Sequence, residues 1–209
     1  MKNVATLVGG TGNDTITLGA ASVNGSVDLG SGSDTLNLAN FTNRVSVANT
    51  ETVHGGSGND TIMLTGSVAA TVIGGAGMNF VSGNSGADRF VFDQNSYGNL
   101  TRVQNFSASN GDKIALDTTA SSTLSGNPYD LGGTGLILNT DLADAANVKA
   151  RLATTLSNGG KGAFVYEQDT GELFYSSNGS FIGGGTMIGS ITTDGSKPWA
   201  FDASSFVQV

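Results

Sequence analysis

The sequence contains no cysteine, and only 2 of its 209 residues are proline. The absence of cysteine excludes a disulfide scaffold, a thiolate metal site and a cysteine nucleophile. No apolar run approaches the roughly 18 residues of a membrane-spanning helix, so no membrane insertion is expected. The 32 glycines have no three-residue period, which excludes collagen and indicates many turns at fixed positions.

The chain also lacks the parts of common enzymes. His54 is the only histidine, and without cysteine partners or an H-E-x-x-H motif it is interpreted as a surface or strand residue. There is no G-x-S-x-G elbow and no P-loop. We expect no catalytic activity in this chain, and any catalytic domain of the native protein would lie N-terminal to Met1.

Acidic residues dominate the charge. The net charge is −8, which is unfavourable for binding nucleic acid or anionic lipid. Of the 17 acids, 14 are aspartate and 3 are glutamate. Short carboxylates in glycine-rich turns suit a hard cation, but aspartate also favours turns without any metal. The spacing of these residues must separate the two interpretations.

Glycine and aspartate recur in five nine-residue units of the pattern G-G-x-G-x-D-x-U-x, in which U is a large apolar residue. Two units match every defined position, and the other three each depart at one. Glycine permits positive φ and leaves room for carbonyls to converge, and the residue at position eight is expected to begin a strand and point inward. The units span residues 9–17, 29–37, 55–63, 74–82 and 83–91.

These units resemble the nonapeptides of the RTX (repeats-in-toxin) family. The resemblance implies a mainly β fold, a parallel β-roll (β-helix or solenoid), in which Ca²⁺ is held between the loops of successive coils. Aspartate from one loop and carbonyls from the next would supply the roughly six to eight oxygen ligands of Ca²⁺. The candidate metal-binding residues are Gly10, Gly12, Asp14, Gly30, Gly32, Asp34, Gly56, Gly58, Asp60, Gly75, Gly77, Asn79 and Asp88.

The spacing of the loops is irregular, because the interval from Asp34 to Asp60 is longer than those from Asp14 to Asp34 and from Asp60 to Asn79. Two nonapeptides make one coil in the family, so each interval is interpreted as one coil with extra residues. We expect one row of calcium loops on one edge, with about two or three ions, and Asn79 would bind without charge. The alternative is stacking without metal, in which neighbouring carboxylates would repel. The intervening strand-like pieces are 26–27, 45–47 and 71–73.

Residues 88–117 resemble the end of the RTX roll in serralysin-type proteases, where A-D-x-F-x-F is followed by I-x-D-F and D-K-I-D-L. Asn105 and Ala115 stand where that pattern has aspartate. The remaining carboxylates are interpreted either as ligands of a terminal ion site or as turn caps. They are Asp93, Asp112 and Asp117.

A small α+β cap (residues 118–209) is expected to follow the roll (residues 1–117). Apolar residues at three- and four-residue steps predict a helix over 141–156. A hairpin is predicted from Phe164 to Tyr175, and a strand over 186–191.

The hairpin, a small-residue turn and an apolar end after Asp202 resemble the uncleaved signal of type I secretion, the ATP-driven export across both membranes of Gram-negative bacteria. The N-terminus has no apolar core of a classical signal peptide, which agrees with this route. An ordinary β-cap that shields the last coil from edge pairing is the alternative, and the two are compatible.

From the sequence we expect a calcium-binding RTX module that folds on Ca²⁺ after transient contact with the type I secretion machinery. It would be the C-terminal part of a larger protein secreted to the exterior or surface of a Gram-negative cell. One alternative is a fragment of an S-layer protein or adhesin that self-associates with calcium, and another is a non-catalytic module of a secreted hydrolase. A carbohydrate-binding module would need an exposed aromatic platform, and Trp199, Tyr97 and Tyr129 are too scattered.

Overall fold

The computed structural model describes residues 6–93, 99–116, 136–139, 163–167, 170–176, 186–193 and 203–208. Within these ranges the chain forms strands β1 to β17 and short 3-10 turns at Ala108–Asn110 and Ala203–Ser205. No helix in these ranges is long and apolar enough to cross a membrane.

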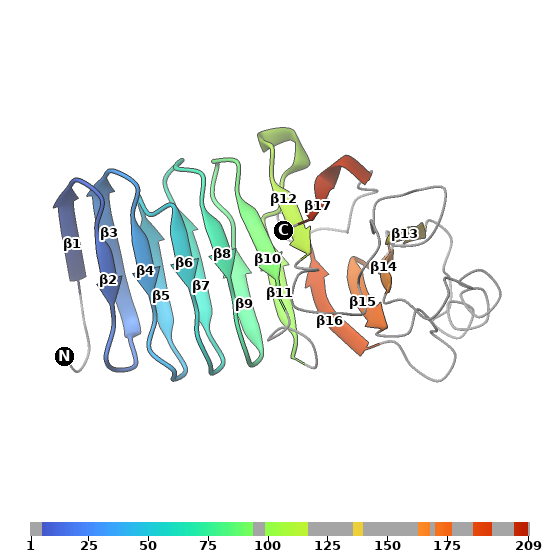
Figure 1. Cartoon of the computed structure of the whole chain (residues 1–209), viewed down its shortest axis with the longest axis horizontal. Coiled ribbons are helices and arrows are strands. Elements are labelled where there is room, and N and C mark those ends of the chain that lie inside the picture. The colour runs from blue at the N-terminus through green and yellow to red at the C-terminus, as the bar shows by residue number, and fades with distance from the viewer. Residues whose placement is uncertain are drawn as a thin grey trace.

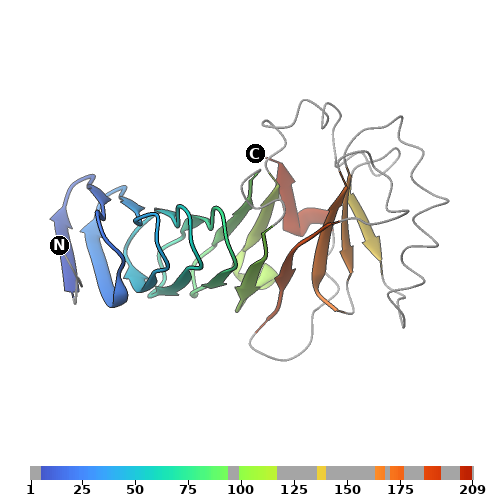
Figure 2. The same ribbon diagram turned by 90° about the horizontal axis from the view of Figure 1, so that it is seen from below.

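Two parallel sheets face each other, and the chain alternates between them along the long axis (Figures 1 and 2). Each strand pairs in parallel with the strand one coil later, so the prediction of a mainly β, parallel β-roll is confirmed. One sheet contains β1 (Thr6–Thr11), β3 (Val23–Ser31), β5 (Arg44–Ala48), β7 (Thr61–Thr65), β9 (Asn79–Ser82) and β11 (Thr101–Gln104). The other contains β2 (Thr15–Thr17), β4 (Thr35–Asn37), β6 (Thr52–His54), β8 (Thr71–Ile73), β10 (Arg89–Phe92) and β12 (Lys113–Leu116).

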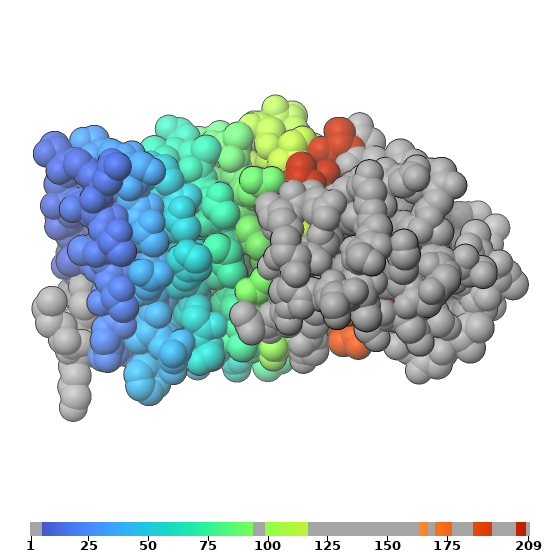
Figure 3. All heavy atoms as spheres, viewed as in Figure 1, coloured from blue at the N-terminus to red at the C-terminus, as the bar shows by residue number. Residues whose placement is uncertain are grey.

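Successive coils follow one another as adjacent bands (Figure 3). The pairing register shows that they differ in length. Thr15 pairs with Thr35, and Thr35 in turn pairs with Thr52, so the second of these coils is shorter than the first. The predicted strand pieces 26–27, 45–47 and 71–73 lie in β3, β5 and β8, as expected.

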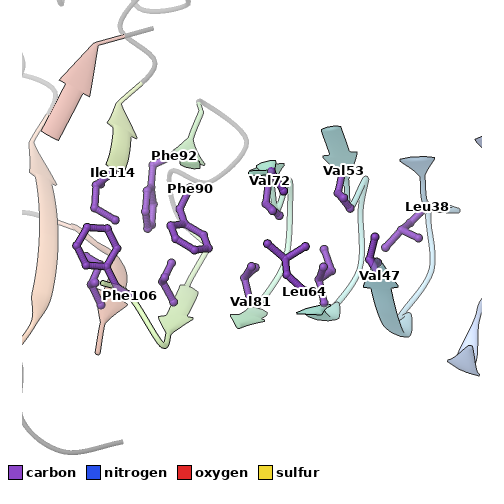
Figure 4. Close-up of a cluster of buried hydrophobic side chains, with 14 of the residues drawn as sticks. Leu38, Val47, Val53, Leu64, Val72, Val81, Phe90, Phe92, Phe106 and Ile114 are labelled. Atoms are coloured by element: carbon purple, nitrogen blue, oxygen red, sulfur yellow. The ribbon is translucent and has the colours of Figure 1, made fainter. Parts of the chain in front are cut away.

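The core is a column of apolar side chains between the two sheets (Figure 4). Four of the five position-eight residues are buried in it as predicted, namely Leu36, Ile62, Val81 and Phe90, whereas Ile16 in the first coil is only partly buried against it. At the last coils the column becomes aromatic, with the Phe90 and Phe106 rings 6.2 Å apart. Burial of each such side chain contributes about 1.5–3 kcal/mol, so the coils hold together mainly through this column.

The C-terminal strands extend both sheets of the roll. β14 (Ala163–Glu167) and β15 (Glu172–Ser176) form the predicted antiparallel hairpin, and β16 (Thr186–Ile191) is the predicted strand. β16 pairs antiparallel with β15 and parallel with β11, while β17 (Phe206–Gln208) pairs with β12. β13 (Leu136–Asn139) pairs with β14 at the far end of the first sheet.

Aromatic side chains pack against one another within the cap. The ring centres of Tyr166 and Phe206 lie 5.4 Å apart, and those of Phe164 and Tyr175 lie 5.0 Å apart. The described part of the cap is made of strands and one short 3-10 turn. The predicted helix over 141–156 lies outside the described residues.

Candidate calcium-binding loops

The five nonapeptide loops lie at two edges of the roll and not in a single row. We call edge 1 the turns that lead from an odd-numbered strand to the next even-numbered strand, and edge 2 the turns that lead back. Asp14, Asp34 and Asp88 lie on edge 1, whereas Asp60 and Asn79 lie on edge 2. The prediction of one row on one edge is therefore wrong, because the interval from Asp34 to Asp60 covers one coil and half of the next.

On each edge one residue per coil occupies an equivalent place, which we call the ladder position. The backbone carbonyl of this residue accepts a hydrogen bond from a backbone N–H in the next coil. The donor is the residue directly after the ladder position of that coil. Thr35, which follows Asp34, donates to Asp14 O in this way at 2.8 Å. The ladder positions on edge 1 are Asp14, Asp34, Glu51, Ala70, Asp88 and Asp112. Those on edge 2 are Ser22, Asn43, Asp60 and Asn79.

One carboxylate oxygen of each ladder aspartate beyond the first coil ties two coils together. Asp34 Oδ1 accepts a hydrogen bond from the backbone N–H of Asp14 at 2.7 Å, one coil earlier. Asp60 Oδ1 accepts in the same way from Asn43 at 2.9 Å. The sequence predicted these carboxylates only as ligands, so this structural role is additional.

The other oxygen of three ladder aspartates has no donor. Oδ2 of Asp14, Asp34 and Asp60 is buried and accepts no hydrogen bond. A buried carboxylate oxygen without a partner is costly, because it has lost its water. In the described ranges no three His, Asp or Glu side chains converge, so a cation here would also need oxygen ligands from the backbone. Carboxylate and carbonyl oxygens are the ligands Ca²⁺ prefers, and these three aspartates therefore fit that ion.

Glycine brings successive loops into close contact. Gly30 has a φ of +94°, and a Cβ added there would collide with the carbonyl of Gly10 in the preceding loop. Gly32 lies in the same way against Gly12. The same arrangement recurs on edge 2, where Gly75 and Gly77 lie against the carbonyls of Gly56 and Gly58. The candidate glycines thus lie where two loops face each other and where carbonyl oxygens gather.

Asn79 and Asp88 differ from the three aspartates with a free oxygen. The amide nitrogen of Asn79 donates to the carbonyl of Gly75 at 3.1 Å, so a nitrogen faces the loop there. Both oxygens of Asp88 accept backbone hydrogen bonds, Oδ1 from Ala70 at 3.0 Å and Oδ2 from Asn84 at 2.9 Å. Neither residue leaves a side-chain oxygen without a donor. Both therefore lack the buried, unpartnered oxygen that marks Asp14, Asp34 and Asp60 as calcium ligands.

Glu51 occupies a ladder position that the sequence analysis missed. Its Oε2 accepts from the backbone N–H of Asp34 at 2.6 Å, which extends the acidic row on edge 1 by one coil. No nonapeptide surrounds it, so the motif does not find it. The sequence does hold one sign of this position, because an acidic residue followed by threonine occurs both at Asp34-Thr35 and at Glu51-Thr52. The two threonines pair with each other in the sheet.

Burial makes several of these carboxylates weak acids. It raises the pKa of Asp60 to about 6, against the lowering effect of the hydrogen bonds from Asn43. It raises the pKa of Asp112 to about 6 as well, and the pKa of Asp88 also rises for the same reason. Keeping these groups ionised without a cation therefore costs free energy near neutral pH.

The remaining candidates fall into three cases. Asp112 acts as a turn cap, since its Oδ2 accepts from Ser107 N at 2.8 Å and its Oδ1 from Asp88 N at 2.8 Å. Asp93 lies just after β10, and Asp117 is outside the described residues. His54 is the half-buried last residue of β6, as predicted for a strand residue.

The same loops match a known family. The family described as RTX calcium-binding nonapeptide repeat (4 copies) matches residues 5–22, 48–63 and 65–95. The chain carries RTX repeats. These RTX nonapeptides bind calcium, so the β-roll is a calcium-binding module. The loop of Asp34 lies outside the matched segments, although its geometry repeats that of Asp14 and Asp60. A comparison with curated proteins gave no match.

Proposed function

We propose that this RTX module is exported loosely folded and folds outside the cell when calcium binds. The observation that carries the proposal is the set of buried, partnerless Oδ2 atoms of Asp14, Asp34 and Asp60. Without a cation these oxygens penalise the folded state, and the glycine-rich coils are entropically costly to order. With a cation the same oxygens become ligands and favour it.

The available binding energy is large enough to act as a switch. A site that binds only the folded state adds about 1.4 kcal/mol when calcium is at ten times its Kd. Three such sites would add about 4 kcal/mol, against a typical domain stability of about 5–15 kcal/mol. Calcium at millimolar levels outside the cell suits the affinities common in extracellular modules.

The proposal includes type I secretion from a Gram-negative cell, with this chain as the non-catalytic, C-terminal part of a larger exported protein. The motif that supports it is the hairpin β14–β15 followed by the apolar end at Phe206–Gln208. Since β17 also pairs with β12, the same segment serves as the β-cap of the second sheet.

Calcium-driven assembly on the cell surface is a second candidate. In the described ranges β1 is the end strand of its sheet, with β3 as its one neighbour, and Val8 on it is 68% exposed. Such an edge is able to pair with another chain. Self-association of the purified protein in calcium, measured by sedimentation, would favour this candidate over a purely monomeric module.

Calcium titration followed by circular dichroism tests the folding switch. We expect Ca²⁺ to increase the β signal and to raise the Tm of the looser fold that remains without it. EGTA should reverse both changes, and Mg²⁺ is the control for a general divalent effect. Identical spectra and melting curves in calcium and EGTA would refute calcium-dependent folding.

Export is tested by deleting Ala203–Val209. The matched control is Phe90→Ala, which loosens the core packing against Phe106 but leaves the whole C-terminal segment in place. We expect the deletion to abolish export through a type I channel and the point variant to keep it. Normal export of the deleted protein would refute a terminal signal.

A further inference from the structure

Asn43 occupies a ladder position on edge 2 without belonging to a nonapeptide. The turn before it, residues 38–43, has no glycine. The side chain is nevertheless 1% exposed, as buried as Asp34 and Asp60 at their ladder positions. Its contacts therefore show what a calcium loop becomes when the carboxylate is replaced by an amide.

The amide has one oxygen and one nitrogen in fixed places. Oδ1 accepts from the backbone N–H of Ser22 at 3.0 Å, the same contact that Asp34 Oδ1 makes with Asp14. Nδ2 has three oxygens within hydrogen-bond distance, which share its two hydrogens: the carbonyls of Ala39 at 2.9 Å and Phe41 at 2.6 Å, and Asp60 Oδ1 at 2.8 Å. Exchanging the two atoms would put an oxygen against three oxygens and an NH₂ group against an N–H, so the network fixes the orientation.

The comparison with Asp34 is direct. Ala39 and Phe41 precede Asn43 by four and two positions, as Gly30 and Gly32 precede Asp34. At Asp34 the second side-chain atom is an oxygen that lacks any donor. At Asn43 the second atom is a nitrogen that donates to the carbonyls of its own loop. The amide thus supplies positive hydrogen atoms where the aspartate loop calls for a cation.

We propose that the Asn43 amide replaces a calcium ion, so that this coil of the roll is held without metal. The inference rests on the proposed function for the role of calcium at the aspartate loops, and it adds which coil does not need the ion. Calcium dependence is then confined to the Asp14–Asp34 pair on edge 1 and to Asp60 on edge 2, on either side of the coil that carries Asn43. The Asn79 amide nitrogen makes a single contact of this kind, to the carbonyl of Gly75, so it would replace an ion less completely than Asn43 does.

Two isosteric exchanges test the proposal in the full chain. Asn43→Asp should bind one more Ca²⁺ per chain, counted by native mass spectrometry, and should melt at a lower temperature than the wild type in EGTA. Asp34→Asn should bind one Ca²⁺ fewer and melt at a higher temperature in EGTA, because the new amide donates to the carbonyls of its own loop. Asn37→Asp on β4 adds the same charge to a half-buried side chain outside the loops and should leave the calcium count unchanged.

The outcomes separate this proposal from the one it rests on. If folded Asn43→Asp binds no additional ion, the replacement is refuted. If Asn43→Asp does not fold even in calcium, Asp34→Asn decides, and a melting temperature in EGTA no higher than that of the wild type refutes the proposal. A wild-type protein that binds no Ca²⁺ would overturn the calcium-dependent function instead.

Discussion

Replacing Asp60 by alanine is the sharpest test of the calcium loops, because one side chain performs both roles found on the ladders. Asp60 Oδ1 accepts hydrogen bonds from Asn43 N at 2.9 Å and Asn43 Nδ2 at 2.8 Å, and its Oδ2 is free for an ion. Asp60→Ala removes all three interactions at a position that is 1% exposed.

The expected magnitude follows from those contacts. A buried N–H left without an acceptor costs about 1–3 kcal/mol. Loss of one ion at ten times its Kd costs a further roughly 1.4 kcal/mol. Together they predict a loss of about 2–4 kcal/mol in calcium, and a Tm lowered by about 5–15 °C at about 2–4 °C per kcal/mol.

In EGTA the outcome should differ, because alanine also removes a buried carboxylate whose pKa is raised to about 6. The relief of that charge offsets the lost hydrogen bonds, and the Tm should fall much less than in calcium. Differential scanning calorimetry in both conditions measures the contrast, with Glu172→Gln on the β15 strand as the charge control. Equal decreases in calcium and EGTA would refute Asp60 as a ligand and leave only its structural role.

Three further perturbations follow from the same geometry. Gly30→Ala should lower the Tm by several degrees, because it strains a φ of +94° and collides with Gly10, while Gly19→Ala, with open space around it, should not. In EGTA the Tm should fall as the pH rises from 5 to 7.5. The folded-state pKa of Asp60 and of Asp112 is about 6, above the ordinary 3.8, so protonation of these two groups favours the folded state. A Tm that rises over that pH range would contradict this expectation. Phe90→Ala should cost about 3–5 kcal/mol equally in calcium and EGTA, since its contact with Phe106 involves no ion; a calcium-dependent loss would contradict that assignment.

The sequence predicted the turns and the inward residues, because each nonapeptide encodes them locally, while the parallel pairing of strands followed from the resemblance to RTX repeats. Leu36 and Ile62 are buried at position eight for that reason. The sequence analysis did not predict which edge each loop occupies, because the edge depends on how many residues the chain uses for the coil between two loops. The interval from Asp34 to Asp60 contains one whole coil, from Thr35 to Thr52, and a further half coil.

The side-chain contacts between coils were also beyond the sequence. Asn13 and Asn59 occupy an undefined position of the motif, yet their Oδ1 atoms accept from Ser33 N and Met78 N of the next loop at 2.9 Å. Glu51 and Asn43 hold ladder positions without any motif around them. Such roles arise only when the register brings distant turns together, and no local pattern reports them.

The two ends of the roll differ in a way that decides how the chain can be shortened. At one end β1 and β2 are the outermost described strands, and each continues into a coil of the same kind. At the other end β16 and β17 cover β11 and β12, the strands beside the phenylalanine-rich core. Trimming one coil from the β1 side would therefore expose a similar pair of strands, as in other repeat proteins, but further trimming would remove the loops of Asp34 and Asp60. Trimming from the opposite side would uncover two bare sheet edges at once, so a minimal calcium-responsive fragment should keep its C-terminal strands.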